Sequence, residues 1–132
     1  MRKELEVKIE EGRDKDKVFL IKELPALQME KWAIRALSAI GKNTSGGVMA
    51  LASMDVPDII NAFAGADTEK TEPLMKELLE SCFFKKDATL VQLKEEFVND
   101  IIEEWKTILR LQWEALQLNL GFLEKGDGSD SK

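Results

Sequence analysis

The chain has 132 residues, of which 44% are hydrophobic and 33% are charged, a balance typical of one soluble globular domain with a modest core. A net charge of −6 disfavours nucleic acid or an anionic membrane as the main partner. We expect neither a transmembrane helix nor a signal peptide, because no apolar run is long enough to span a bilayer and the first residues are charged. A single cysteine allows no internal disulfide and fits a reducing cytoplasm.

The beginning of the chain predicts an antiparallel β-hairpin. Apolar and charged residues alternate over residues 5–9, and a second apolar run follows at residues 18–21. Gly12 and Asp14 lie between the two runs and are typical of a turn. Pro25 ends the second strand, because proline cannot donate a hydrogen bond to a neighbouring strand.

After Pro25 the spacing of apolar residues becomes helical. Four helices are predicted before the last one, over residues 25–40, 48–54, 56–64 and 67–84. The first of them places its apolar residues on one inward face: Leu27, Trp32, Ala33, Ala36, Leu37 and Ile40. Thr68 is the candidate N-cap of the fourth helix. Residues 85–93 fit either a loop or a short third strand.

The last helix is expected to run from about Lys94 to about Leu123. Its main apolar stripe contains Val98, Ile102, Trp105, Leu109, Trp113, Leu116, Leu120 and Leu123. A second strip, formed by Leu111, Leu118 and Phe122, lies roughly opposite. Such a helix would be about 45 Å long, in a domain with a diameter of roughly 36 Å. Either it breaks near Gln112, or its end projects and needs a partner.

These elements predict an α+β fold that is mainly α, with an N-terminal β-hairpin packed on a bundle of about five helices and a long C-terminal helix. We expect a single domain over residues 1–123, comprising the hairpin (1–24) and a helical part (25–123). Residues 124–132 are polar and rich in Gly and Ser, which predicts a disordered tail.

The residues that catalysis requires are scarce. There is no histidine or tyrosine, and Cys82 is expected to be an inert core thiol, because no imidazole exists to activate it. Residues 41–47 (GKNTSGG) lack the preceding glycine of a phosphate-binding loop. The acidic residues of the tail lack the bidentate glutamate of a calcium loop. We therefore predict no catalytic residues, no cofactor and no metal site.

The three tryptophans are the largest candidate anchors. Trp32 and Trp105 are interpreted as core residues. Trp113 fits the core and an interface equally well, because the end of the last helix could stand clear of the domain.

The order of several motifs resembles the tail assembly chaperones of long-tailed bacteriophages. The similarity involves the turn Gly12-Arg13-Asp14, the following strand, Leu24-Pro25-Ala26 and the helix around Trp32. The segments VMALASM, EPLMKELLESC and ILRLQWEALQLNLGF are also similar to apolar helices of that family. The loop GKNTSGG matches no pattern of the family.

The resemblance implies a non-enzymatic protein of the host cytoplasm, absent from the mature virion. Such a protein binds the phage tape measure protein and keeps it soluble while the tail tube assembles around it. A frameshifted longer form would add a region that binds the tail tube protein, and a homo-oligomer is expected. The predicted contact residues are Leu111, Trp113, Leu118 and Phe122, which could instead close the protein's own core.

Two other functional classes remain open from the sequence. One is a structural tail subunit, such as a tail completion protein. The other is a small metal-dependent hydrolase, which the scarcity of catalytic residues disfavours.

Overall fold

The computed structural model describes residues 2–40 and 56–125, except for the side chains of residues 40, 56, 59, 60 and 121–125. The predicted helix over residues 48–54 and the GKNTSGG loop lie outside the described residues, as does the tail beyond residue 125.

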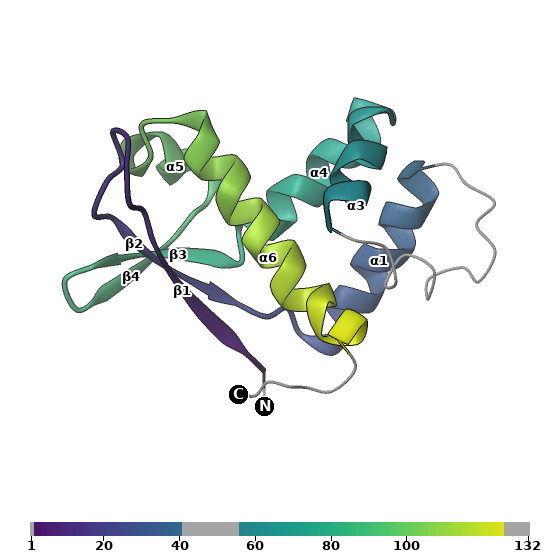
Figure 1. The fold of residues 1–132 in the computed structure, drawn as a ribbon, viewed down its shortest axis with the longest axis horizontal. Helices are drawn as coiled ribbons and strands as arrows, with labels where there is room; N and C mark the ends of the chain where they lie inside the picture. The colour runs from purple at the N-terminus through teal and green to yellow at the C-terminus, as the bar shows by residue number, and fades with distance from the viewer. Residues whose placement is uncertain (1, 41–55, 126–132) are drawn as a thin grey trace.

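A four-stranded antiparallel sheet forms one part of the molecule (Figure 1). Its strands are β1 (Glu4–Lys8), β2 (Val18–Lys22), β3 (Cys82–Lys86) and β4 (Thr89–Gln92), in the spatial order β1-β2-β3-β4. The hairpin predicted near the N-terminus is therefore confirmed as β1 and β2. The second hairpin, β3 and β4, begins at Cys82, inside the stretch that was predicted to be helical up to residue 84, and continues through residues 85–92.

The predicted fourth helix was too long, since α4 (Thr68–Leu79) ends before Cys82 and the following residues form β3. Cys82 lies opposite Ile21 in the sheet, and Phe84 lies opposite Phe19. This pairing extends the apolar inner face of the first hairpin, a stabilisation that is invisible in local helical spacing. Of the two alternatives for residues 85–93, a strand is the one observed.

The remaining helices are α1 (Ala26–Ile40), α3 (Val56–Ala64), α5 (Glu95–Ile101) and α6 (Trp105–Lys125). The first turn of α4 is capped by Asp67, whose carboxylate accepts a hydrogen bond from the Glu69 backbone N–H at 3.0 Å. The predicted cap at Thr68 was thus one residue too late, because aspartate at the preceding position can reach the free backbone donors.

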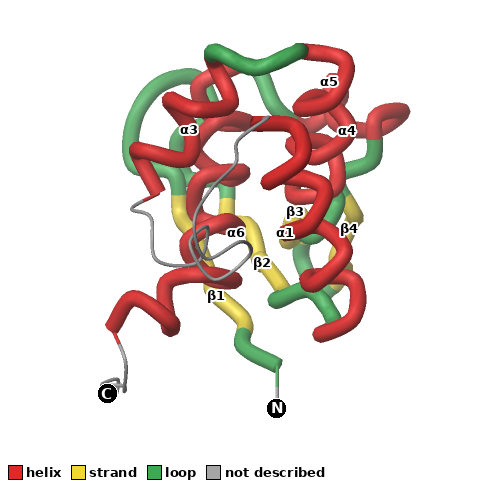
Figure 2. Tube along the Cα trace, turned by 90° about the vertical axis from the view of Figure 1, so that its right-hand side faces the viewer, coloured by secondary structure: helices red, strands yellow, loops and turns green. Residues whose placement is uncertain are grey.

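Helix α6 is the central element of the fold. It contacts β1 and β2 of the sheet, and it also contacts α3 and α4 (Figures 1 and 2). Helix α1 packs against α3 and α4. Helix α6 therefore packs against both the sheet and the other helices, which explains why apolar residues occur on more than one of its faces.

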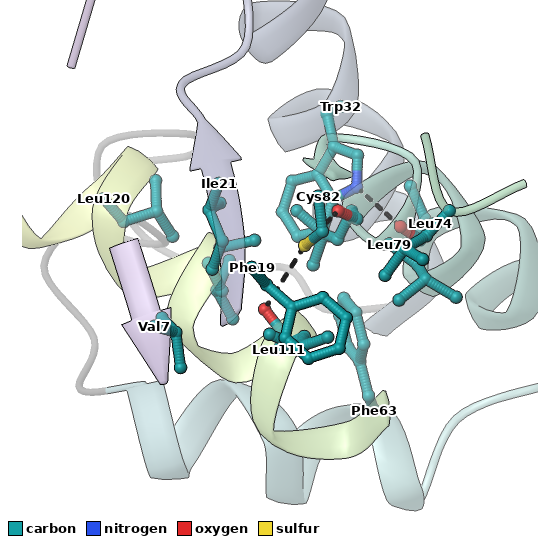
Figure 3. Packing of buried hydrophobic residues seen from close by; sticks show 14 of the residues in the cluster. Val7, Phe19, Ile21, Trp32, Phe63, Leu74, Leu79, Cys82, Leu111 and Leu120 are labelled. Atoms are coloured by element: carbon teal, nitrogen blue, oxygen red, sulfur yellow. Dashed lines mark hydrogen bonds between the residues drawn. The ribbon is translucent and has the colours of Figure 1, made fainter. Parts of the chain in front are cut away.

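The core lies where the inner face of the sheet meets the helices (Figure 3). Trp32 is fully buried, as predicted, and its indole N–H donates to the Leu74 carbonyl at 3.0 Å. Its ring centroid lies 6.0 Å from that of Phe63. Leu27, which was expected on the same inward face, is 62% exposed, because at about 100° per residue it lies on the side of α1 opposite Ala36.

The long helix predicted from residue 94 to 123 is interrupted at residues 102–104, not near Gln112. Asp14 is responsible for the geometry at this interruption. Its fully buried carboxylate accepts hydrogen bonds from the backbone N–H groups of Glu103 (2.8 Å) and Glu104 (3.0 Å), from the Thr107 hydroxyl (2.7 Å) and from the Lys17 ammonium (2.8 Å). A side chain of the hairpin turn thus caps the start of α6.

The two residues before Asp14 also hold the hairpin turn against the start of α6, a connection that we call the joint. Gly12 has a φ of +88°, and a Cβ atom there would lie 2.7 Å from a carboxylate oxygen of Glu104, so only glycine fits without strain. Arg13 donates to the Glu103 carbonyl at 3.1 Å through its side chain and to the Glu104 carboxylate at 3.2 Å through its backbone N–H. The turn motif from the sequence is therefore a structural joint.

Candidate functional site

The first half of α6 exposes a stripe of large apolar side chains, which we call the α6 stripe: Trp105, Leu109 and Trp113. Their exposed fractions are 70%, 37% and 38%. The three residues are spaced by four, so they lie on one face of the helix. Leu116 and Leu120 continue that face in the second half of α6, where both are buried. The stripe is therefore the uncovered end of a continuous apolar face.

The α6 stripe is held on a rigid support. The α6 helix is anchored at its start by Asp14, and Gln112 donates from its side-chain amide to the Met75 carbonyl of α4 at 3.1 Å. Arg110 and Glu114 form an i,i+4 ion pair with an N–O distance of 3.7 Å. A preorganised helix with an exposed aromatic face loses little conformational entropy when it binds.

The four predicted contact residues do not form one surface in the structure. Trp113 belongs to the α6 stripe, whereas the side chain of Phe122 is outside the described residues. Leu111 is fully buried, and its carbonyl lies 3.9 Å from the Cys82 sulfur, which donates a weak hydrogen bond to it (Figure 3). Leu118 is half-buried against the core.

The expectation that Leu111 and Leu118 form an open second strip was therefore wrong, because the sheet covers that side of α6. The main apolar stripe is covered only in part: Val98, Ile102, Leu116 and Leu120 are buried, but Trp105, Leu109 and Trp113 are exposed. The interpretation of Trp105 as a core residue was wrong for the same reason. Trp105 and Leu109 were not among the predicted contact residues. Their regular spacing places them on one apolar face of the helix, but the sequence does not identify which element covers that face.

A second apolar region lies between α5 and the end of the sheet. Phe84, Val91, Phe97 and Ile101 line a cavity of about 420 Å³ there, with Lys17, Lys86 and Asp100 also at its walls. Its walls mix apolar with charged side chains. The α6 stripe is therefore the stronger candidate for a protein-binding surface.

The buried thiol of Cys82 is unsuited to nucleophilic chemistry. Burial raises the pKa of this thiol to about 12, although the Ser81 side chain opposes the shift. The thiolate is the reactive form, so it is scarcely populated near neutral pH.

The described residues contain neither a metal-binding cluster nor a membrane-spanning helix. Within residues 2–40 and 56–125, no group of three or more His, Cys, Asp or Glu side chains is arranged to hold a metal ion. None of the described helices combines the length and apolar character needed to cross a membrane.

Comparison with known proteins assigns the family. No curated protein and no solved structure matches the chain. A family model described as "Phage tail assembly chaperone protein, TAC" matches residues 15–129, which include all the helices and three of the four strands that the structure describes. With the match extending over most of the sequence, the chain belongs to the phage tail assembly chaperone family.

Proposed function

We propose that this chaperone is a non-enzymatic protein of the host cytoplasm that binds the tape measure protein through the α6 stripe and keeps it soluble for tail tube assembly. The observation that carries the proposal is the exposure of two tryptophans and a leucine on one face of an anchored helix. Tryptophan is among the residues that contribute most to binding at protein interfaces.

The chemistry of the α6 stripe fits a helical client. Side chains at i, i+4 and i+8 present a straight apolar ridge, which packs against the apolar face of an amphipathic helix. Next to the ridge, Lys106 is exposed and can pair with acidic residues flanking such a face, whereas Arg110 already pairs with Glu114. A long helical tape measure protein would offer many such segments.

The expected binding affinity suits a client that is bound only temporarily. Fully burying a large apolar side chain contributes about 1.5–3 kcal/mol, and the three residues of the stripe are already partly covered. After the cost of association, the surplus corresponds to a contact of roughly micromolar strength. The client can therefore be released when tube subunits replace the chaperone.

The test is co-expression with the tape measure protein. The triple variant Trp105→Gln, Leu109→Gln and Trp113→Gln should lower the soluble, co-purifying fraction of the tape measure protein several-fold. A matched control exists on α1, where Leu27 and Ile34 are 62% and 51% exposed. Changing these two to Gln should leave capture intact. Equal capture by the stripe variant and the wild type, with both folded by circular dichroism, would refute the proposal.

Two further parts of the proposal concern the infected cell. The protein should be absent from purified virions, and a longer frameshifted form should carry a region that binds the tail tube protein. Mass spectrometry of virions and of infected cells tests both statements. Stoichiometric amounts of the protein in virions would instead favour a structural tail subunit, such as a tail completion protein.

A further inference from the structure

Strand β1 is an edge strand whose outward backbone groups are open. The Ile9 N–H donates to the Lys17 carbonyl at 2.9 Å, and the Glu23 N–H donates to the Lys3 carbonyl at 2.9 Å. Hydrogen-bonded pairs alternate in an antiparallel ladder, so the odd-numbered residues of β1 bond to β2. The N–H and C=O groups of Glu4, Glu6 and Lys8 therefore point away from β2. Within the described part of the chain, nothing bonds to them.

The opposite edge of the sheet is less available. Strand β4 has four residues, and its Gln92 carbonyl accepts a hydrogen bond from the Lys94 N–H at 2.9 Å. The Gln92 side chain also donates to the Glu80 carbonyl at 2.7 Å. Among the described residues, none forms a hydrogen bond with the outward backbone groups of β1, and the strand contains neither proline nor glycine. Open edges of this kind recruit another strand unless charges on them prevent it.

We propose that β1 pairs in antiparallel fashion with β1 of a second copy of this chain, around a two-fold axis at Glu6. The sheets of the two copies then become one continuous sheet. In this register Glu4 lies opposite Lys8 of the second copy, and Lys8 lies opposite its Glu4. The central pair and these two outer pairs each exchange two backbone hydrogen bonds, because all their members point outward. This inference does not depend on what the α6 stripe binds.

The charges of the strand select this register. With the axis at Glu6, each copy places Glu4 against Lys8, and the flanking Arg2 lies opposite Glu10. A shift of two in one direction puts Glu4 against Glu6 and Arg2 against Lys8, so that no pair is attractive. A shift in the other direction puts Glu4 against Glu10 and keeps only the pairs between Glu6 and Lys8 attractive. Both shifts bring like charges together, which destabilises the pairing.

The contact at the axis is tolerated on both faces of the sheet. The two Glu6 side chains meet there, but each has a countercharge in its own copy, because the Glu6 carboxylate lies 2.8 Å from the Lys85 ammonium. On the inner face Leu5 lies opposite Val7, so the apolar layer continues across the interface. The charges therefore permit pairing between copies while they oppose other registers.

The experiment is a charge swap in the full chain, measured by sedimentation velocity at low salt. Neither Glu4 nor Lys8 forms an ion pair within the described residues, so single changes should not unfold the protein. Glu4→Lys alone and Lys8→Glu alone should each weaken dimerisation about tenfold, because each replaces two attractive pairs by two repulsive ones. The double variant Glu4→Lys/Lys8→Glu should regain wild-type association.

The most decisive measurement is made on a mixture of the two single variants. The two single variants, combined in equal amounts, should form a mixed dimer, because one copy then carries only lysines and the other only glutamates at these positions. Three results would overturn the proposal: a wild-type protein that stays monomeric, single variants that dimerise like the wild type, or a double variant that fails to recover. Dimerisation that the triple Gln variant of the α6 stripe abolishes, and the charge variants leave unchanged, would assign self-association to α6 instead.

Discussion

Trp32 and Trp105 show how one residue type at helical spacing reaches two opposite environments. Trp32 of α1 is fully buried and bonds through its indole N–H, whereas Trp105 of α6 is 70% exposed. Both were predicted to be core residues from the same apolar periodicity. Periodicity identifies the residues that share a helical face, but the neighbouring elements determine whether that face is covered. The interior and the α6 stripe should therefore respond differently to substitution.

The largest expected effect is at Trp32. Trp32→Ala should lower the free energy of unfolding by about 3–5 kcal/mol, because the lost aromatic leaves a cavity against Leu74 and Phe63. That is a large share of a typical domain stability of about 5–15 kcal/mol. Urea unfolding followed by circular dichroism measures it. A variant as stable as the wild type would show that this tryptophan is not part of the core.

Two leucines of α6 sharpen the comparison within one helix. Leu111→Ala should cost about 2–5 kcal/mol, because this side chain is fully buried against the sheet. Leu109→Ala, only two positions earlier, should cost clearly less, because Leu109 is 37% exposed. Thermal and urea unfolding of the two variants should rank them in this order. Equal losses would contradict the assignment of the two faces.

Asp14 links the two regions and predicts a pH dependence. Burial by itself raises the pKa of this carboxyl, but hydrogen bonds from Lys17, Thr107 and the backbone N–H groups of Glu103 and Glu104 outweigh it and lower the pKa from 3.8 to about 2. The folded state thus binds the proton more weakly than the unfolded chain. This contribution of roughly 2 kcal/mol is fully present above about pH 4 and is lost as the pH falls to about 2.

The variant Asp14→Asn isolates that contribution. It should be less stable than the wild type at neutral pH, and its stability should fall less steeply between about pH 4 and pH 2. Urea unfolding of both proteins across this range measures the difference, since the other carboxyl groups contribute to both. Parallel curves for the two proteins would show that Asp14 is not the titrating group.

The smallest effect on stability is expected at Trp105. Trp105→Gln should change the free energy of unfolding by no more than about 0.5 kcal/mol, because most of the side chain is already in water. Thermal unfolding provides the measurement, with Trp32→Ala as the comparison. A loss approaching that of Trp32→Ala would place Trp105 in the core and remove it from the proposed binding surface.

Local signals were enough to predict some of the fold. The first hairpin followed from alternation and a turn around Gly12, and α1 followed from its apolar face between Pro25 and Gly41. Strand β3 was missed because its apolar residues continue the helical spacing of α4. Its strand character comes from pairing with β2, about sixty residues earlier in the chain.

The candidate site was predicted only in part, for a related reason. Trp113 was among the proposed contact residues, but the face that contains Leu111 was assigned to the wrong side. Two distant elements decide this orientation. The sheet covers Leu111, and the Asp14 turn starts α6 at Trp105 and breaks the predicted helix. Neither effect can be predicted from the spacing of the apolar residues within residues 94–123.

The joint between the Asp14 turn and α6 also sets an order of events during synthesis. Asp14 bonds to Thr107, 93 positions later, so the joint can form only after most of the chain has left the ribosome. Until then Phe19 and Ile21 of β2 lack the helix that covers them. Contacts between such distant residues slow folding and prolong the exposure of apolar surface. During its own synthesis, this chaperone therefore passes through a stage in which it exposes the kind of surface that chaperones cover.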